Sequence, residues 1–285
     1  MINPSYPLNL ILVLAITLLT GADTHPTARN PVKIPRTVPI GKDISMCQTE
    51  VSVDEWLEFM DANHLDASTF PDDSALPSRW YKVLFTDLKR RDHLEHLIHA
   101  ADGRYRFKKD SLIRSLIKEP EVFPGNTPIT GITYAQALRF CEWKEAEVNK
   151  DRPPGRQIRI GLPSTDVYKR VIPNIDSVAA VRKSNWRCPG FKFNYKHACC
   201  DVPTKDIGSL QGLTVMRVDA YWPTDLNLFC IQGNVAEMTA TKGVAMGGSY
   251  QHYAYQSHSD QTQSYSGPEP WLGFRFIVTL KTHDQ

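Results

Sequence analysis

The sequence has almost no excess of either charge. Its 285 residues hold 33 Lys and Arg against 31 Asp and Glu, which leaves a formal net charge of +2. The basic residues are scattered and form no stripe interleaved with aromatic side chains, the pattern typical of nucleic-acid-binding surfaces. The run Lys89-Arg90-Arg91 is interpreted as a solvated helix face. We therefore expect no nucleic-acid partner.

Long apolar runs are also missing, apart from one near the N-terminus. Residues 8–19 have the length of a signal-peptide core and are too short for a comfortable membrane span. Small residues follow at Gly21 and Ala22, where cleavage is expected. We predict a signal peptide over residues 1–22, with an uncleaved anchor as the alternative. The predicted location is secreted, periplasmic or in the cell envelope, with no membrane span once the signal is removed.

Cysteine is absent after Cys230, and the cysteines present fit an exported protein. An even number suggests disulfides in such a compartment. A bridge from Cys188 to Cys199 or Cys200 would close a short loop and is the first expectation, although the sequence leaves the pairing open. A metal or redox site at the vicinal pair is the less favoured alternative, because neighbouring cysteines rarely reach one metal together. The full set is Cys47, Cys141, Cys188, Cys199, Cys200 and Cys230.

Proline and apolar spacing divide the chain. Residues 23–43 are proline-rich without apolar periodicity, so we expect a linker there and a single domain over 44–285. Alternation predicts a first strand at 44–51. Ser52 and Glu55 then form an S-x-x-E capping box that predicts a helix start.

Further elements are predicted along the domain. Thr133 is a predicted N-cap for a helix that reaches residue 149, preceded by a strand or edge segment from residue 128. Another helix is expected within 80–100 and a short one at 110–118. Strand-like pieces occur at 190–195 and 213–218. Residues 61–123 are interpreted as a variable insertion.

Short β-prone runs between glycines make up residues 229–277. They read F-C-I-Q-G-N-V-A-E-M-T, V-A-M-G-G-S-Y and W-L-G-F-R-F-I. Glycines at such places mark tight turns or close backbone approaches. The ordered set resembles the end of the formylglycine-generating-enzyme (sulfatase-modifying factor) family, whose pattern is roughly G-N-V-W-E-W, R-G-G-S-W and G-F-R. Earlier blocks, including G-I-T-Y-A-Q-A-L-R-F-C-E-W and G-L-P-S-T-D-V-Y, resemble other family motifs.

The resemblance implies a fold. The matching blocks span about residues 44 to 278, which is nearly all of the expected mature chain. The implied fold is an irregular, C-type-lectin-like α+β domain with two main helices, small antiparallel sheets and many loops. Function does not follow from fold, because function depends on the site.

The resemblance also locates the catalytic positions. Catalytic members carry two cysteines, two and seven residues after the aromatic residue of G-G-S-Y/W, and bind copper through them. Counting from Tyr250 gives His252 and Ser257. A serine cannot replace the soft thiolate that copper(I) prefers. We therefore expect no copper and no formylglycine generation, and we favour the interpretation that the chain is not an enzyme.

The calcium site implied by the resemblance is altered as well. It uses the Glu of G-N-x-x-E, here Glu237, and a side-chain oxygen where this chain has Cys230. Calcium prefers oxygen ligands, so we expect calcium binding to be weakened or lost. Asn234 and Arg275, and Glu237 if calcium is absent, would then be structural.

The segment after Tyr250 lacks arginine as far as Arg275 and is rich in aromatic and amide side chains. Such side chains offer stacking faces and hydrogen bonds. We predict a site for a protein, peptide or glycan, with a solvated polar loop as an equal alternative. The predicted ligand-binding residues are Tyr250, His252, Tyr253, Tyr255 and Gln256.

Two functions from different classes follow. The first is an exported, divergent family member that does not generate formylglycine and acts as a binding or assembly module. The alternative is a metal-dependent oxidase, with non-haem iron or copper held by His252, His258 and Asp260. These residue types suit a 2-His-1-carboxylate site.

Overall fold

A computed structural model describes residues 36–91, 97–99, 105–107, 124–173, 193–196, 214–221 and 223–281. All of them lie in one compact unit, Pro35–Gln285. The predicted signal peptide, the helix at 110–118 and the cysteines Cys188, Cys199 and Cys200 lie outside these residues. No helix in the described part is both long enough and apolar enough to cross a membrane.

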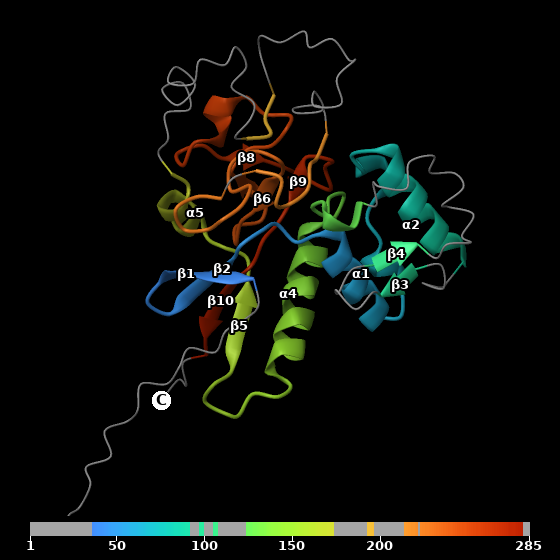
Figure 1. Cartoon of the computed structure of the whole chain (residues 1–285), viewed down its shortest axis with the longest axis horizontal. Helices are drawn as coiled ribbons and strands as arrows, with labels where there is room; N and C mark the ends of the chain where they lie inside the picture. The colour runs from blue at the N-terminus through green and yellow to red at the C-terminus, as the bar shows by residue number, and fades with distance from the viewer. Residues whose placement is uncertain are drawn as a thin grey trace, which may run out of the picture. The chain divides into compact units, whose positions relative to one another are not determined.

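The first sheet joins the two ends of the described chain (Figure 1). Its strands are antiparallel, and β2 (Ile44–Cys47) and β10 (Ile277–Leu280) lie at its centre. β1 (Thr37–Gly41) and β5 (Ile158–Gly161) form its edges. β1 falls inside the expected linker 23–43, so the folded part begins before Ile44. Pairing with β2 orders this segment despite its prolines.

The second sheet is built from the glycine-punctuated stretch. Its order is β8 (Gln263–Ser264), β7 (Val244–Met246), β6 (Ala236–Met238) and β9 (Leu272–Gly273). β6 and β9 are parallel, and the other pairs are antiparallel. These very short strands place the G-N-V-x-E and G-F-R motifs side by side.

The predicted capping box at Ser52 and the predicted N-cap at Thr133 are confirmed. Ser52 and Glu55 cap α1 (Val53–Ala62), and the Ser52 amide donates to the Glu55 carboxylate at 3.0 Å. Thr133 caps α4 (Tyr134–Asn149) together with Gln136. α4 lies against β5 (Figure 1). Ser164 caps the shorter α5 (Thr165–Val171), which follows β5.

Aromatic side chains fill the space between α1, α4 and the C-terminal segment. Trp56 and Phe140 stack with ring centroids 5.7 Å apart. Phe274 meets Phe140 edge-on at 5.4 Å. The Trp56 indole donates to the Thr69 carbonyl at 3.0 Å, so its polar atom is satisfied in the core. With few helices and small sheets, the fold is mixed α+β, as expected.

The predicted insertion holds its own elements. They are α2 (Arg79–Arg91), the strand pair β3 (Leu97–His99) and β4 (Tyr105–Phe107), and the 3-10 turns η1 (Ala67–Thr69) and η2 (Asp73–Ala75). The 3-10 turn η4 (Pro124–Asn126) follows the predicted insertion directly. The helix expected within 80–100 therefore ends at Arg91, and residues 97–99 form a strand instead.

One strand prediction was wrong, and the strand or edge segment predicted from residue 128 is present only as a single bridge. Residues 214–218 form no strand, because the Asn234 side chain takes the place of a neighbouring strand. The Met216 amide donates to Asn234 Oδ1 at 2.8 Å, and Asn234 Nδ2 donates to the Met216 carbonyl at 3.2 Å. Residues 128–133 also form no strand, and Pro128 makes a single bridge with Ser52.

Candidate functional site

Two residues of the glycine-punctuated stretch 229–277 form a buried ion pair. Glu237 is placed by β6, and Arg275 follows β9; their side chains are 1% and 0% exposed. The guanidinium binds the carboxylate in a bidentate manner, with Nε and Nη2 each 2.6 Å from one oxygen. The Tyr168 hydroxyl donates to the same carboxylate at 2.6 Å. Both Glu237 oxygens are thus engaged.

Arg275 also gathers backbone carbonyls from distant segments. Its Nη1 donates to the carbonyls of Cys47 and Gln48 at 3.2 and 3.1 Å, and Nη2 donates to Phe229 at 2.8 Å. These bonds give Arg275 the structural role expected of it. They tie the end of β2 to the G-N-V-x-E segment.

These residues do not fit a calcium ion. The carboxylate of Glu237 accepts from a guanidinium, whose positive charge would repel calcium. Cys230 is buried, and burial raises the pKa of its thiol well above its ordinary value. A neutral thiol is a poor ligand for a hard cation.

A second buried carboxyl, Glu50, lies close to this pair. Its Oε1 accepts from Asn234 Nδ2 at 2.9 Å, while Oε2 has no hydrogen-bond partner among the described residues. Asn234 has a positive φ of 62° and receives a further bond from Asn194 Nδ2. Burial raises the pKa of Glu50, and the charge of Arg275 opposes this only in part. Glu50 is therefore protonated well above the pH at which an ordinary glutamic acid ionises.

His252 is held by local contacts. Its Nδ1 lies 2.6 Å from Ser249 Oγ, and its ring meets Trp271 edge-on at 4.8 Å. Burial lowers the pKa of His252, so the imidazole is neutral at pH 7. Nδ1 of His252 is therefore already hydrogen-bonded to a serine of the same turn.

Ser257 is enclosed. It ends the 3-10 turn η7 (Ala254–Ser257), is 2% exposed, and its Oγ has no hydrogen-bond partner among the described residues. It packs against Gly248, where an added Cβ would lie 2.2 Å from that oxygen. The two positions that motif spacing matches to the family's cysteines therefore hold a neutral imidazole and a buried hydroxyl. They do not fit a copper ion that needs two thiolates.

The predicted iron ligands are not gathered into one site. Within the described residues, no group of three or more His, Cys, Asp or Glu side chains is arranged to hold a metal ion. Asp260 is exposed, and His258 Nε2 is buried without a hydrogen-bond partner in the described part. His252, His258 and Asp260 thus lack the convergence that an oxidase site requires.

Of the predicted ligand-binding residues, Tyr253 and Tyr255 lie together at the surface, whereas others lie behind them or support the turn. The rings of Tyr253 and Tyr255 are nearly parallel, at 10°, with centroids 6.1 Å apart, and Tyr255 is 61% exposed. Tyr250 is buried. The Gln256 amide oxygen accepts from the Tyr253 backbone at 2.9 Å and supports the turn.

Lys196 belongs to the same surface, although sequence reasoning missed it. Its Nζ lies 5.1 Å from the Tyr253 ring centroid, and its amide donates to the His252 carbonyl at 2.8 Å. We name Lys196, Tyr253 and Tyr255 the tyrosine face. Lys196 is far from the two tyrosines in sequence, and no local pattern links them.

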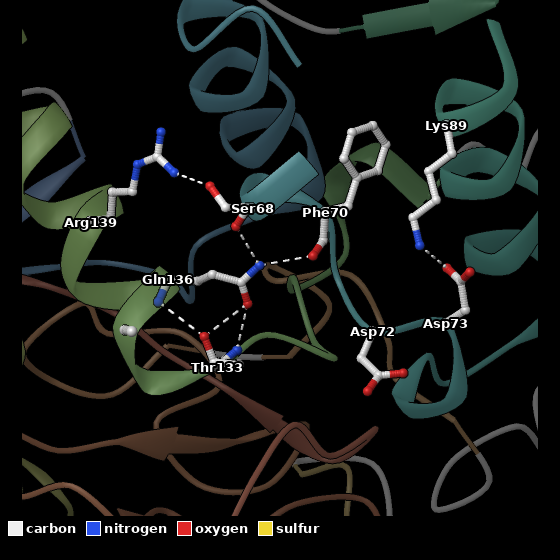
Figure 2. A pocket seen from close by; sticks show the side chains of 9 residues that line it. Ser68, Phe70, Asp72, Asp73, Lys89, Thr133, Gln136 and Arg139 are labelled. Carbon is white, nitrogen blue, oxygen red and sulfur yellow. Dashed lines mark hydrogen bonds and ion pairs between the residues drawn. The ribbon is translucent and has the colours of Figure 1, made fainter. Parts of the chain in front are cut away.

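A hollow of about 640 Å³ lies on another part of the domain, between η1, η2 and α2 on one side and the first turn of α4 on the other (Figure 2). Sequence reasoning missed it because one wall comes from the segment interpreted as an insertion and the other from the start of α4. The turn-rich S-T-F-P-D-D run was its one visible signal. Its lining residues are Ser68, Phe70, Asp72, Asp73, Lys89, Thr133, Ala135, Gln136 and Arg139.

The described cysteines are structural. Cys47, Cys141 and Cys230 are free and buried, so these three form no disulfide in the structure, contrary to the general expectation of pairing. Burial raises the pKa of Cys47 to about 12. It also raises the pKa of Cys141 and Cys230. These thiols stay protonated near pH 7 and are poor nucleophiles.

Comparisons with solved structures find several similar chains. PvdO from Pseudomonas aeruginosa is 13% identical with a TM-score of 0.47, over 88% of this chain and 87% of that one. CarF is 14% identical with a TM-score of 0.47, over 84% and 87%. Treponema denticola variable protein 1 is 14% identical with a TM-score of 0.45, over 84% of both chains. No curated protein matches the sequence.

A family model gives the decisive comparison. The sulfatase-modifying factor enzyme 1-like domain matches residues 9–280, nearly the whole chain. The G-N-V-x-E and G-F-R motifs that suggested this family supply two strands of the second sheet and the buried ion pair, and G-G-S-Y directly follows β7. The chain belongs to the sulfatase-modifying factor enzyme 1-like (formylglycine-generating-enzyme) family.

Proposed function

We propose that this chain is an exported family member that does not generate formylglycine and acts as a binding or assembly module. The observation that carries the proposal is the chemistry of two positions. His252 is neutral and bonded to Ser249, and Ser257 is buried against Gly248. The described cysteines are buried and protonated, so none of them supplies a thiolate. Without a soft ligand pair, the residues cannot hold copper for oxygen activation.

The tyrosine face supports the binding role. Two nearly parallel rings, one of them 61% exposed, offer a flat apolar surface, and Lys196 adds hydrogen-bond donors beside them. A ligand with a flat apolar side and polar edges suits this arrangement. Both a glycan ring and a peptide side chain have that form.

A binding experiment tests the role of this face. The full chain would be screened against immobilised glycans and peptides, and hits would be measured again with Tyr255→Ala. We expect affinity to fall about tenfold, since a large contact area is lost. Leu226→Ala, at another exposed apolar position, is the matched control and should bind unchanged. Equal binding by Tyr255→Ala and the unaltered chain would overturn the assignment of the face.

Separate measurements test the other parts of the proposal. A sulfatase-type peptide with one cysteine, incubated with the protein, copper and oxygen, should keep its thiol as shown by mass spectrometry. Formation of an aldehyde in that peptide would overturn the non-catalytic assignment.

Export predicts that the mature protein recovered from the envelope or medium begins near residue 23, which N-terminal sequencing would check.

A further inference from the structure

The segment that carries Lys196 is fixed to the core by the G-N-V-x-E motif. The Asn234 amide donates to the Asn194 carbonyl at 2.7 Å, and Asn194 Nδ2 donates to Asn234 Oδ1 at 3.1 Å. Gly233 approaches the same segment so closely that an added Cβ would lie 2.6 Å from the Asn194 carbonyl oxygen. Residues 193–196 are therefore held in one position against a buried part of the domain.

The same segment is joined to the aromatic part of the tyrosine face. Lys196 and Tyr253 form an isolated parallel bridge, and the Lys196 amide donates to the His252 carbonyl at 2.8 Å. Lys196 Nζ lies 5.1 Å from the centroid of the Tyr253 ring. Because the backbone fixes both residues, the ammonium and the ring meet before any ligand arrives. Such preorganisation lowers the cost of ordering the site on binding.

The positive charge of the tyrosine face has no counter-charge. Lys196 is exposed, and within the described part of the chain no carboxylate forms an ion pair with it. The other two members of the face are tyrosines, so the face holds one ammonium and no acidic side chain. An anionic group on a ligand would therefore be attracted to Lys196 without displacing an acid of the protein.

The main-chain groups of the face are already engaged. The Tyr253 amide donates to Gln256 Oε1 at 2.9 Å, and the Gln256 amide donates to the Tyr253 carbonyl at 2.9 Å. The His252 carbonyl accepts from Lys196. A peptide that adds as an extended strand relies on free main-chain groups, and the face does not present such a row. It presents side chains instead, chiefly the Tyr255 ring, which is 61% exposed, and the ammonium.

We propose that the tyrosine face binds an acidic glycan, a chain of sugar rings that carry carboxylate or sulfate groups. The apolar side of one sugar ring stacks on Tyr255, and an acidic group contacts the Lys196 ammonium. The rings of Tyr253 and Tyr255 are 6.1 Å apart, so a short oligosaccharide reaches both points. The proposal rests on the binding role proposed above for this face and narrows its ligand to one class.

Titration of the full chain with short glycans, followed by ligand-observed NMR, tests the charge of the ligand. The probes are trimers of glucuronate, galacturonate and mannuronate, each beside its methyl ester, which keeps the ring and removes the charge. Sulfated cellotriose beside cellotriose tests sulfate as the source of charge. We expect at least one acidic trimer to bind with a Kd of about 1 mM or below, and its uncharged form to bind about three- to fivefold more weakly. The difference should shrink as salt is raised. Equal binding of acidic and uncharged forms, or no binding of any acidic trimer, would overturn the proposal.

Matched variants separate this inference from the binding role itself. Lys196→Met removes the charge but keeps an unbranched stem, so it should weaken the acidic trimer about three- to fivefold and leave its uncharged form unchanged. Lys196→Arg keeps the charge and should retain the preference for the acid. Lys42→Met removes an exposed lysine between β1 and β2 and is the control.

Tyr255→Ala should weaken the acidic and the uncharged forms alike, because both lose the stacking surface. If Lys196→Met also weakens both forms equally, its effect is structural and the acidic ligand is refuted. Neutral glycans that bind as well as acidic ones and lose affinity in Tyr255→Ala would refute the acidic ligand while the binding role stands. Unchanged binding of both forms by Tyr255→Ala would refute the face as the binding site, and the acidic ligand with it.

Discussion

At the scale of single residues, burial decides what the polar groups of this domain can do. Arg275, Glu237 and Glu50 lie in its interior, where a carboxylate can stay ionised only beside a positive charge. Glu237 has that partner at 2.6 Å. Glu50 accepts a hydrogen bond from the Asn234 side-chain amide and has no ion pair with Arg275 among the described residues, and burial raises its pKa. Glu237 is thus paired with a guanidinium, whereas burial raises the pKa of Glu50.

Removing one half of the ion pair should therefore be costly. Glu237→Gln keeps the size of the side chain but leaves the charge of Arg275 buried and unpaired. We expect the free energy of unfolding to fall by about 3–5 kcal/mol in urea denaturation. Asp219→Asn, which breaks the surface pair with Arg217, should change it by less than about 1 kcal/mol. A similar small loss in both variants would contradict the structural role of the buried pair.

The effect of Glu50→Gln on the free energy of unfolding should depend on pH. The pKa of Glu50 is raised on folding, so the wild-type stability it contributes is complete below the unfolded value of about 4.5 and is lost as pH rises towards the folded value. The glutamine variant has no proton to lose. Chemical denaturation from pH 4.5 to 8 should show the variant gaining stability relative to wild type as pH rises. Parallel curves for the two proteins would show that Glu50 does not titrate in this way.

At the scale of elements, the sequence could predict what local chemistry determines. The starts of α1 and α4 depend on side chains three residues apart, Ser52 with Glu55 and Thr133 with Gln136, and both were predicted correctly. The strand expected at 213–218 is absent because an amide from Asn234, far along the chain, satisfies Met216. Local alternation carries no information about such a partner. Lys196 was missing from the predicted ligand site for the same reason, because it is distant in sequence from Tyr253 and Tyr255.

The α4 cap gives a prediction at this scale. Thr133→Ala removes the oxygen that accepts from the Gln136 amide at 3.2 Å and should lower the free energy of unfolding by about 1 kcal/mol. Thr133→Ser keeps the hydroxyl and should differ from wild type by only a few tenths of a kcal/mol. Urea denaturation with unchanged slope would measure both. Equal losses in the two variants would indicate that the methyl group, rather than the cap, matters.

At the scale of the whole molecule, family membership and activity come from different residues. The motif glycines, Glu237 and Arg275 build the small sheet and its buried pair, and these identify the family. The chemistry would depend on the positions held by His252 and Ser257. Motif spacing assigns those positions from sequence, and the assignment stays a prediction. The hollow between η1 and the first turn of α4 could not be predicted, because it forms only when the segment around η1 meets α4.

The sheet that joins the two ends of the described chain supplies a prediction about where the folded unit starts. β1 pairs with β2, and β2 pairs in turn with β10 from the other end. A variant beginning at Arg36 keeps all of these strands and should melt at the same temperature as a variant beginning at residue 23.

A variant beginning at Ile44 exposes the β1-facing edge of β2 to water. Each 1 kcal/mol lost corresponds to a fall of roughly 2–4 °C in Tm for a domain of this size. Losing an edge strand of five residues should therefore lower Tm by several degrees in calorimetry. If all three variants melt together, β1 contributes no stability and residues 23–43 act as the linker that their proline content suggested. A drop confined to the Ile44 variant would instead place the beginning of the folded domain at β1.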